Sequence, residues 1–259
     1  MANATKVVNI GVFVPSETQL LDMACIDVFH MMSREYLGLE SMELLPKHIR
    51  ALAPSVKISY ITSKEHHAEA GGLLPITSGL KIATTHDVTH PDVQPGKLDI
   101  LLVPGPDPYG TWGEDVLEFL RGHVAATETT DVLSVCTGVF LCGAAGVLEG
   151  RAVCGPRGVQ DMLREKYPRT KWVGEKVRWW RDGNLWTSGG ITNGNDLVAA
   201  YARASGKHFP APVVEIACQM ADVGDREQEY GQGQTTYFVS FMWQVVKAWF
   251  VKPAKAKTI

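Results

Sequence analysis

The chain has 259 residues, of which 45% are hydrophobic, and its 25 Lys and Arg against 28 Asp and Glu give a formal net charge of −3. This content supports a substantial α/β core, and the lack of a dense basic stripe argues against a nucleic acid partner. The five cysteines form no Cys-x-x-Cys pair, which argues against a disulfide framework and a metal site and predicts a reducing, cytoplasmic location.

The first half of the chain alternates apolar runs with helical spacing. Buried-type strands are predicted over residues 7–14, 55–62 and 98–103, and helices over 20–32 and 116–126. Only a few polar residues precede the first strand, so no secretory signal peptide is expected. The segment 33–54 is longer than a usual connection, which predicts an insertion or an extra short helix.

The second half continues the same alternation. A strand ending near residue 135 passes directly into a helix, a further helix is predicted over 159–167, and two strands, 177–181 and 184–187, flank the turn Asp182-Gly183. A glycine-rich loop, 188–194, leads into a helix over 195–204. Strands alternating with helices predict a doubly wound parallel sheet sandwich, an α/β fold.

The α/β rhythm is lost after residue 209. The predicted division is therefore an α/β domain, 1–209, and a C-terminal helical extension, 210–259, with helices over 213–220 and 237–251. The last helix contains Gln244 and Lys247 and is shorter than the roughly 20 residues that span a bilayer, so no stable membrane insertion is expected.

Cys136 occupies the most informative position in the chain. The apolar residues Val132, Leu133 and Val135 lead up to it, and a Gly/Ala-rich helical pattern follows without an intervening loop. This is the sequence form of a nucleophile elbow, in which the nucleophile projects above the sheet and the next helix directs its positive dipole end at it. The pattern predicts a reactive cysteine with a favoured thiolate.

Two other loops are expected to reach the same place. In a doubly wound sheet, ligands bind at the carboxyl ends of the strands. The loops 104–109 and 188–193 both follow predicted strands, as Cys136 does. The sequence therefore predicts one site built from three loops.

Four ordered motifs carry a family resemblance. They are Leu21-Asp22, the run from Leu98 to Gly105, the elbow Ser134-Val135-Cys136-Thr137-Gly138 with residues 143–150, and the run from Arg181 to Thr192. Together they resemble the ThiJ/PfpI superfamily, which has the class I glutamine amidotransferase-like (flavodoxin-like) fold, and within it the isonitrile hydratase branch. The resemblance covers about residues 7–205.

The resemblance implies a catalytic pair. It makes Cys136 the nucleophile and places the acid Asp22 against it, where a carboxyl group can exchange a proton with the thiol, substrate or water. The alternatives are a buried structural cysteine and a helix-capping aspartate. Thr137 is the third candidate. Its backbone N–H could bind an oxyanion, or its hydroxyl could bind a substrate nitrogen. The alternative is that Thr137 only caps the helix.

The resemblance also implies a substrate-binding loop that departs from the family pattern. Gly105 matches the loop that supplies an anion-binding N–H, but Pro106 replaces the usual second glycine. Since proline has no N–H, either Asp107 supplies the donor or the donor is missing.

A second set of binding residues follows from the later motifs. Gly190, Ile191 and Thr192 match a loop that walls the family's pocket. Where isonitrile hydratases have a Thr-Thr-His-Trp run, this chain has Arg157 after Pro156 and no histidine. Arg157 is therefore a candidate cation, either lowering the thiol pKa or holding an anionic substrate.

The function that the resemblance implies is cysteine-dependent hydration of an isonitrile, a small electrophile, to an N-substituted formamide. No metal or organic cofactor is expected. Two alternatives stay open: cofactor-free glyoxalase or deglycase chemistry on 2-oxoaldehydes, and a non-enzymatic redox sensor or chaperone-like dimer that oxidises Cys136.

A homodimer is also expected, because relatives associate and the last helix offers a large aromatic surface. Membrane-surface binding is the alternative role of that helix. The aromatic residues concerned are Phe238, Phe241, Trp243, Trp249 and Phe250.

Overall fold

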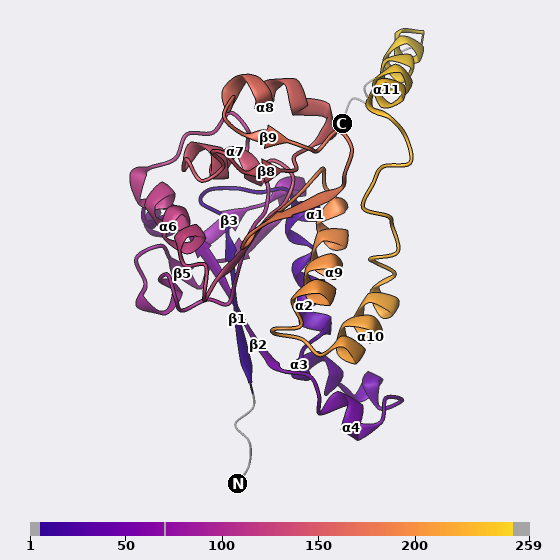
Figure 1. The fold of residues 1–259 in the computed structure, drawn as a ribbon. Helices are drawn as coiled ribbons and strands as arrows, with labels where there is room; N and C mark the ends of the chain where they lie inside the picture. Colours follow the sequence, from indigo (N-terminus) through magenta and orange to yellow (C-terminus); the bar gives the residue numbers. More distant parts are fainter. Residues whose placement is uncertain (1–5, 70, 251–259) are drawn as a thin grey trace, which may run out of the picture.

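A central seven-stranded sheet lies between two layers of helices in the computed structural model, which describes residues 6–69 and 71–250 (Figure 1). The strand order is β10-β11-β7-β6-β1-β2-β5. All neighbouring pairs are parallel except the β10–β11 hairpin. The strands are β1 (Val7–Phe13), β2 (Ser55–Thr62), β5 (His86–Asp87), β6 (Ile100–Val103), β7 (Asp131–Ser134), β10 (Trp179–Asp182) and β11 (Leu185–Ser188). The predicted doubly wound sheet is confirmed.

Apolar residues on both faces of the central strands create two hydrophobic clusters. On one face, Phe29, Tyr201 and Val213 pack over the sheet, and on the other Phe119 and Phe140 do so. Full burial of such a side chain contributes roughly 1.5–3 kcal/mol, so the two clusters fix both helical layers. The helices of the first layer are α2 (Ile26–Met31), α9 (Asn193–Ser205) and α10 (Ala211–Ala221), and those of the second are α6 (Glu114–Ala125) and α7 (Gly138–Ala144).

Short helices and two small sheets lie outside the main sheet and its two helical layers. The predicted insertion 33–54 contains three single-turn helices, and two small two-stranded sheets, β3–β4 and β8–β9, lie outside the main one. The remaining elements are α1 (Leu20–Met23), α3 (Arg34–Leu37), η1 (Glu40–Met42), α4 (Lys47–Arg50), α5 (Lys64–Glu69), β3 (Leu73–Pro75), η2 (Thr77–Gly79), β4 (Lys81–Ala83), η3 (Pro91–Val93), β8 (Ala152–Val153), η4 (Arg157–Val159), α8 (Gln160–Lys166) and β9 (Lys171–Trp172).

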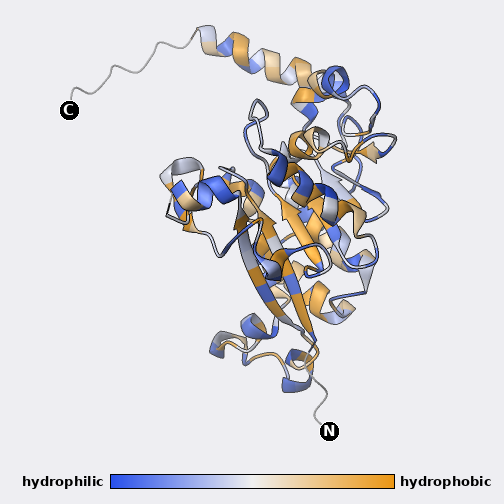
Figure 2. Ribbon diagram, turned by 90° about the vertical axis from the view of Figure 1, so that its left-hand side faces the viewer, coloured by the Kyte–Doolittle hydropathy of each residue, from blue (hydrophilic) through white to orange (hydrophobic). Residues whose placement is uncertain are grey.

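The two helices of the C-terminal extension differ in their packing. Helix α10 buries Val213, Val214 and Ala217 in the first cluster. Helix α11 (Gln234–Trp249) buries no residue and stands apart from the sheet as a largely apolar rod (Figures 1 and 2). Its predicted last residue, 251, lies outside the described part of the chain, and the boundary after residue 209 stays a prediction. No helix within the described ranges is both long and apolar enough to cross a bilayer.

Candidate active site

Cys136 lies in a tight turn between β7, which ends at Ser134, and α7, which begins at Gly138. Its φ of 56° is in the left-handed region, which costs a non-glycine residue energy. The turn requires glycine at position 138, because a Cβ there would lie 2.4 Å from the carbonyl oxygen of Val103 in the neighbouring strand β6. The predicted strand-to-helix turn is confirmed, and it buries Cys136 to 6% exposure.

Asp22, in the single-turn helix α1, faces the Cys136 thiol. The carboxyl is 1% exposed, and burial raises its pKa from 3.8 to about 7. The Cys136 thiol and the Gly105 backbone N–H counteract part of that rise in the pKa. Neither contact completes a hydrogen bond, and both carboxyl oxygens lack a partner among the described residues. Asp22 is therefore a buried carboxyl that takes up and releases a proton near neutral pH.

The thiol of Cys136 is protonated at neutral pH. Burial, followed by the negative charge of Asp22, raises its pKa to about 12, while the backbone N–H groups of Ile191 and Thr137 act in the opposite direction. The expectation of a favoured thiolate is therefore wrong for the resting protein, because desolvation outweighs the donors at the helix start. In the resting protein, Cys136 is therefore a thiol and lies beside the Asp22 carboxyl, which titrates near neutral pH.

Ile191 contributes a backbone donor to the site through an unusual conformation. Its φ is 46°, although a β-branched residue strongly disfavours the left-handed region. This geometry directs its N–H toward the Cys136 sulfur. Such strain costs on the order of 1–3 kcal/mol and is typically found at functional sites. Ile191 was predicted as a pocket wall, and its role as a donor has no sequence signal.

Gly105 packs tightly against Thr137 and Asp22, beside Cys136. A Cβ on Gly105 would lie 2.4 Å from Asp22 Oδ2 and 2.4 Å from Thr137 Oγ1, so only glycine fits. The Thr137 hydroxyl donates a hydrogen bond of 2.7 Å to the Pro106 carbonyl and does not cap α7. Pro106 therefore supplies an acceptor that fixes Thr137. The capping alternative for Thr137 is wrong, because its hydroxyl bonds the neighbouring loop.

A cavity of about 400 Å³ opens onto Cys136. It brings together four predicted residues, namely Cys136, Arg157, Gly190 and Ile191. Arg157 is not among the groups that shift the Cys136 pKa, so its proposed influence on the thiol has no support. The other lining residues are Gln19, Pro156, Gly158, Asn193, Tyr230 and Tyr237.

Three predicted binding residues lie elsewhere. Gly105, Pro106 and Asp107 line an adjacent hollow of about 270 Å³, which shares Gln19 with the Cys136 cavity. The Asp107 carboxylate accepts a hydrogen bond from the Tyr109 backbone N–H at 3.0 Å.

Thr192 is also outside the cavity lining. Its carbonyl and hydroxyl oxygens accept hydrogen bonds from Arg226, at 2.8 Å and 3.3 Å. Thr192 thus holds the end of the glycine-rich loop in place.

Three lining residues lie outside the segments that the sequence predicts at the site, namely Gln19, Tyr230 and Tyr237. Gln19 comes three positions before Asp22, so its placement in the same segment was the available signal. Asn193 belongs to the loop 188–193, which the sequence already predicts at the site. Tyr230 and Tyr237 come from the region interpreted as a polar linker and a docking helix, where the sequence gives no sign of contact with Cys136.

No histidine completes a Cys-His-acid triad. None of the eight histidines, all within the described ranges, lines the cavity. His86, His90 and Asp92 form a group whose ligand atoms lie within 4.8 Å of one another, the geometry of a candidate metal site. His86 lies in edge strand β5 and His90 and Asp92 follow it, whereas Cys136 follows β7 in the sheet interior.

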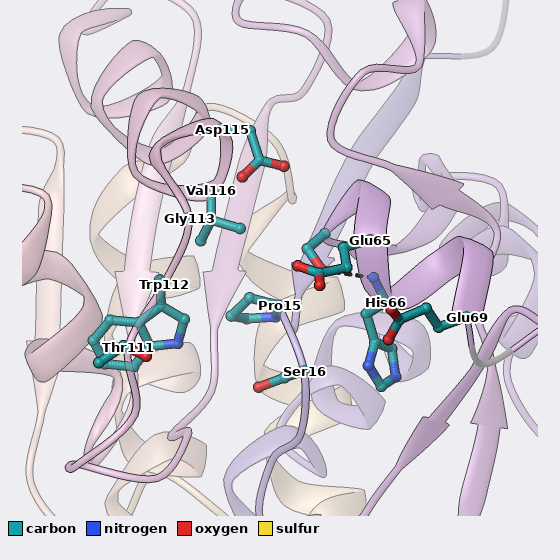
Figure 3. Close-up of a pocket in the computed structure, with 11 residues that line it drawn as sticks. Pro15, Ser16, Glu65, His66, Glu69, Thr111, Trp112, Gly113, Asp115 and Val116 are labelled. Carbon is teal, nitrogen blue, oxygen red and sulfur yellow. Dashed lines mark hydrogen bonds between the residues drawn. The ribbon is translucent and has the colours of Figure 1, made fainter.

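A further hollow of about 170 Å³ lies between α5 and the start of α6. Figure 3 shows Glu65, Glu69 and His66 on one wall and Trp112 and Asp115 on the other. It contains no cysteine and none of the predicted site residues. An acidic hollow of this kind does not compete with the Cys136 cavity as a reactive site.

The fold and the site together define a class: a doubly wound α/β protein with a cysteine in a strand-to-helix turn and an acid against it. The chain matches the DJ-1/PfpI family over residues 38–204 and belongs to that family. The resemblance to the ThiJ/PfpI superfamily is thereby confirmed. Asp22 and the segment beyond residue 204 lie outside the matched residues.

One relative is similar to this chain along most of its length. Isonitrile hydratase from Pseudomonas putida is 33% identical over 178 residues, which cover 68% of this chain and 71% of that protein.

Solved structures confirm the fold. DJ-1beta from Drosophila melanogaster has a TM-score of 0.61 at 14% identity, covering 84% of this chain and 99% of its own. A ThiJ/PfpI family protein from Pseudomonas syringae has a TM-score of 0.58 at 19% identity, covering 94% of this chain and 88% of its own.

Proposed function

We propose that this protein is a cysteine-dependent hydratase that adds water to an isonitrile and releases an N-substituted formamide. The observation that carries the proposal is the buried Cys136 thiol, which lines the cavity and faces the Asp22 carboxyl. The 33% identity to isonitrile hydratase supports this substrate class. The reaction belongs to the hydro-lyases and uses no group from outside the chain.

In the first step, Cys136 adds to the isonitrile. The Asp22 carboxylate takes the thiol proton while sulfur forms a bond to the terminal carbon of R–N≡C. Asp22 then delivers the proton to that carbon, which gives the thioimidate Cys136–S–CH=N–R. Because the negative charge of Asp22 is one cause of the raised Cys136 pKa, neutralising Asp22 by transfer of the thiol proton removes part of the penalty on the thiolate.

In the second step, water releases the product. Asp22, again a carboxylate, takes a proton from water as the water oxygen adds to the thioimidate carbon. Asp22 passes this proton to the nitrogen. The C–S bond then breaks as the hydroxyl oxygen forms the C=O bond, the hydroxyl proton returns to sulfur, and R–NH–CHO leaves with the thiol restored. The backbone N–H groups of Ile191 and Thr137, which face the sulfur, stabilise negative charge as it develops there.

Two features favour hydration over the alternatives. Glyoxalase-type relatives use a glutamate and often a histidine with the cysteine, whereas Asp22 is the acid here and no histidine among the described residues lines the cavity. Peroxide sensing requires a thiolate at rest, whereas the raised pKa of Cys136 keeps its thiol protonated until Asp22 takes the proton.

The decisive experiment treats the intact protein with a model alkyl isonitrile and follows both product and protein mass. The wild type is expected to form the formamide, and Cys136→Ala is expected to form neither product nor adduct. Cys142→Ala removes a fully buried thiol from α7, the helix that follows Cys136, and serves as the matched control. The proposal is wrong if the wild type yields neither formamide nor a Cys136-dependent adduct.

We also propose a homodimer in a reducing, cytoplasmic compartment. All five cysteines are free and buried, which suits such a compartment. The apolar side chains of α11 are largely exposed, including Trp243 at 56% and Trp249 at 79%. Association through α11 would cover them. Size-exclusion chromatography of a chain ending at Gly233 tests this: a dimer that persists would contradict the assignment of α11 to the interface.

A further inference from the structure

The outer wall of the Cys136 cavity comes from the C-terminal extension. Tyr230 precedes α11, Tyr237 lies in its first turn, and both line the cavity together with Cys136. The segment 230–237 lies beyond the family match, which ends at residue 204. This part of the pocket therefore comes from residues outside the family match.

Arg157 holds the wall in place from the body of the domain. Its guanidinium carbon lies 4.1 Å from the centroid of the Tyr230 ring and 4.7 Å from that of Tyr237. It donates hydrogen bonds to the Gln232 carbonyl at 2.7 Å and to Gln234 Oε1 at 3.2 Å. Gln234 Nε2 donates in return to the Arg157 carbonyl at 2.8 Å. Hydrogen bonds to a charged group and two cation–π contacts fix both rings at the cavity.

Further contacts fix Tyr230. Asn193 Nδ2 donates to its hydroxyl at 2.9 Å, its backbone N–H donates to the Lys176 carbonyl at 2.9 Å, and Arg178 lies 4.5 Å from its ring centroid. Asn193 also lines the cavity, two residues after the strained Ile191. The aromatic wall is therefore tied to the loop that directs a backbone N–H at the Cys136 sulfur.

The chemistry of the lining defines what fits. Two tyrosine rings, Ile191 and Pro156 supply apolar surface, and Arg157 is the one charged side chain on the lining within the described residues. A volume of about 400 Å³ lies in the range of pockets that enclose organic ligands and is much larger than a methyl group. Flat apolar groups gain about 0.5–1.5 kcal/mol from ring contacts beyond their buried area.

We propose that Tyr230 and Tyr237 form a subsite for an aromatic substituent on the substrate. This substituent is neutral or anionic, because the positive charge of Arg157 would repel a cationic group. The proposal rests on the proposed function for the reacting group, with the aryl group packing against the tyrosines while the isonitrile carbon reaches Cys136. The extension thus sets the substrate class.

The test compares benzyl isonitrile with methyl isonitrile in the wild type, in Tyr237→Leu and in Phe241→Leu. Leucine keeps apolar volume but removes the ring. The wild type is expected to have the higher kcat/KM for the benzyl substrate. The ratio of the two kcat/KM values is expected to fall about three- to tenfold in Tyr237→Leu, chiefly through KM. Phe241, an exposed ring on the same helix outside the cavity, is the control and is expected to keep the wild-type ratio.

A second measurement separates this proposal from the proposed function. Iodoacetamide and N-benzyl iodoacetamide alkylate a thiol with loss of iodide, whatever reaction the enzyme catalyses. Faster labelling of Cys136 by the benzyl reagent, lost in Tyr237→Leu, would support the subsite even if no isonitrile is hydrated. Equal discrimination in wild type and Tyr237→Leu, with both probes and with unchanged thermal midpoints, would overturn it.

Discussion

Replacing Asp22 with asparagine is expected to stabilise the protein above neutral pH while removing its activity. Burial raises the pKa of Asp22 from 3.8 to about 7, so between these values the folded chain keeps a proton that the unfolded chain has released. Where the folded state binds more protons, stability falls as the pH rises. Ionisation of the carboxyl therefore does not lower the unfolding free energy below pH 3.8, and it lowers that free energy by its full amount above about pH 7.

The size of this penalty follows from the same values. A change in pKa from 3.8 to about 7 corresponds to about 4 kcal/mol, of which roughly 2–3 kcal/mol arise between pH 5 and pH 8. At 1% exposure the group has almost no solvent to screen it. Asparagine has nearly the same shape and does not titrate, and its amide oxygen can accept from the Gly105 N–H.

Urea denaturation of wild type and Asp22→Asn at pH 5 and pH 8 measures the effect. The variant's advantage in unfolding free energy is expected to grow by roughly 2–3 kcal/mol between the two pH values. Because the amide does not titrate, any effect of the amide itself on the unfolding free energy is the same at both pH values and cancels in this comparison. Asp27→Asn, an exposed carboxyl on the next helix, is the control and is expected to follow the wild type. Parallel pH profiles for wild type and Asp22→Asn would refute a buried carboxyl with a raised pKa.

Three further outcomes are expected. The kcat/KM for an isonitrile should rise with pH through about 7, as Asp22 becomes the carboxylate that accepts the thiol proton; a flat profile would exclude that role. Gly105→Ala should lower kcat/KM on the order of 100-fold and cost about 1–3 kcal/mol of stability, because its Cβ would clash with Asp22 and Thr137. Urea denaturation should show no such cost for Gly231→Ala, whose Cβ would meet open space. Burial lowers the pKa of His123 to about 4, so stability should fall as the pH drops from 6.5 to 4, and His123→Gln should reduce that fall in acid denaturation.

The sheet and the turn at Cys136 were predictable because local sequence determines them. The fully buried run from Ile100 to Val103 and the abrupt change from β-type residues to small helical ones at Cys136 are patterns that a few neighbouring residues create. The order of the motifs then indicated the family. These features depend on periodicity and turn chemistry, which a single sequence carries.

The protonation states were not predictable, because burial arises from the whole fold. The helix start after Cys136 suggested a thiolate, but desolvation and Asp22 raise the thiol pKa to about 12. The left-handed Ile191 had no signal either, since nothing in its residue type favours a positive φ. The tyrosine wall depends on Arg157 reaching a segment about 75 positions away, a contact that only the tertiary structure reveals.

Three costly features meet at one sulfur, and their coincidence argues that Cys136 is a reactive group rather than a structural cysteine. Cys136 and Ile191 are both held at positive φ, at roughly 1–3 kcal/mol each, and Asp22 adds about 4 kcal/mol at neutral pH. Their sum is comparable to the 5–15 kcal/mol by which a typical domain is stable. A cysteine needed only for packing would be satisfied by apolar neighbours, as Cys142 is in the core on the following helix, α7. Around Cys136 the fold instead maintains an ionisable carboxyl and two backbone donors, the groups that proton transfer and charge stabilisation at sulfur require.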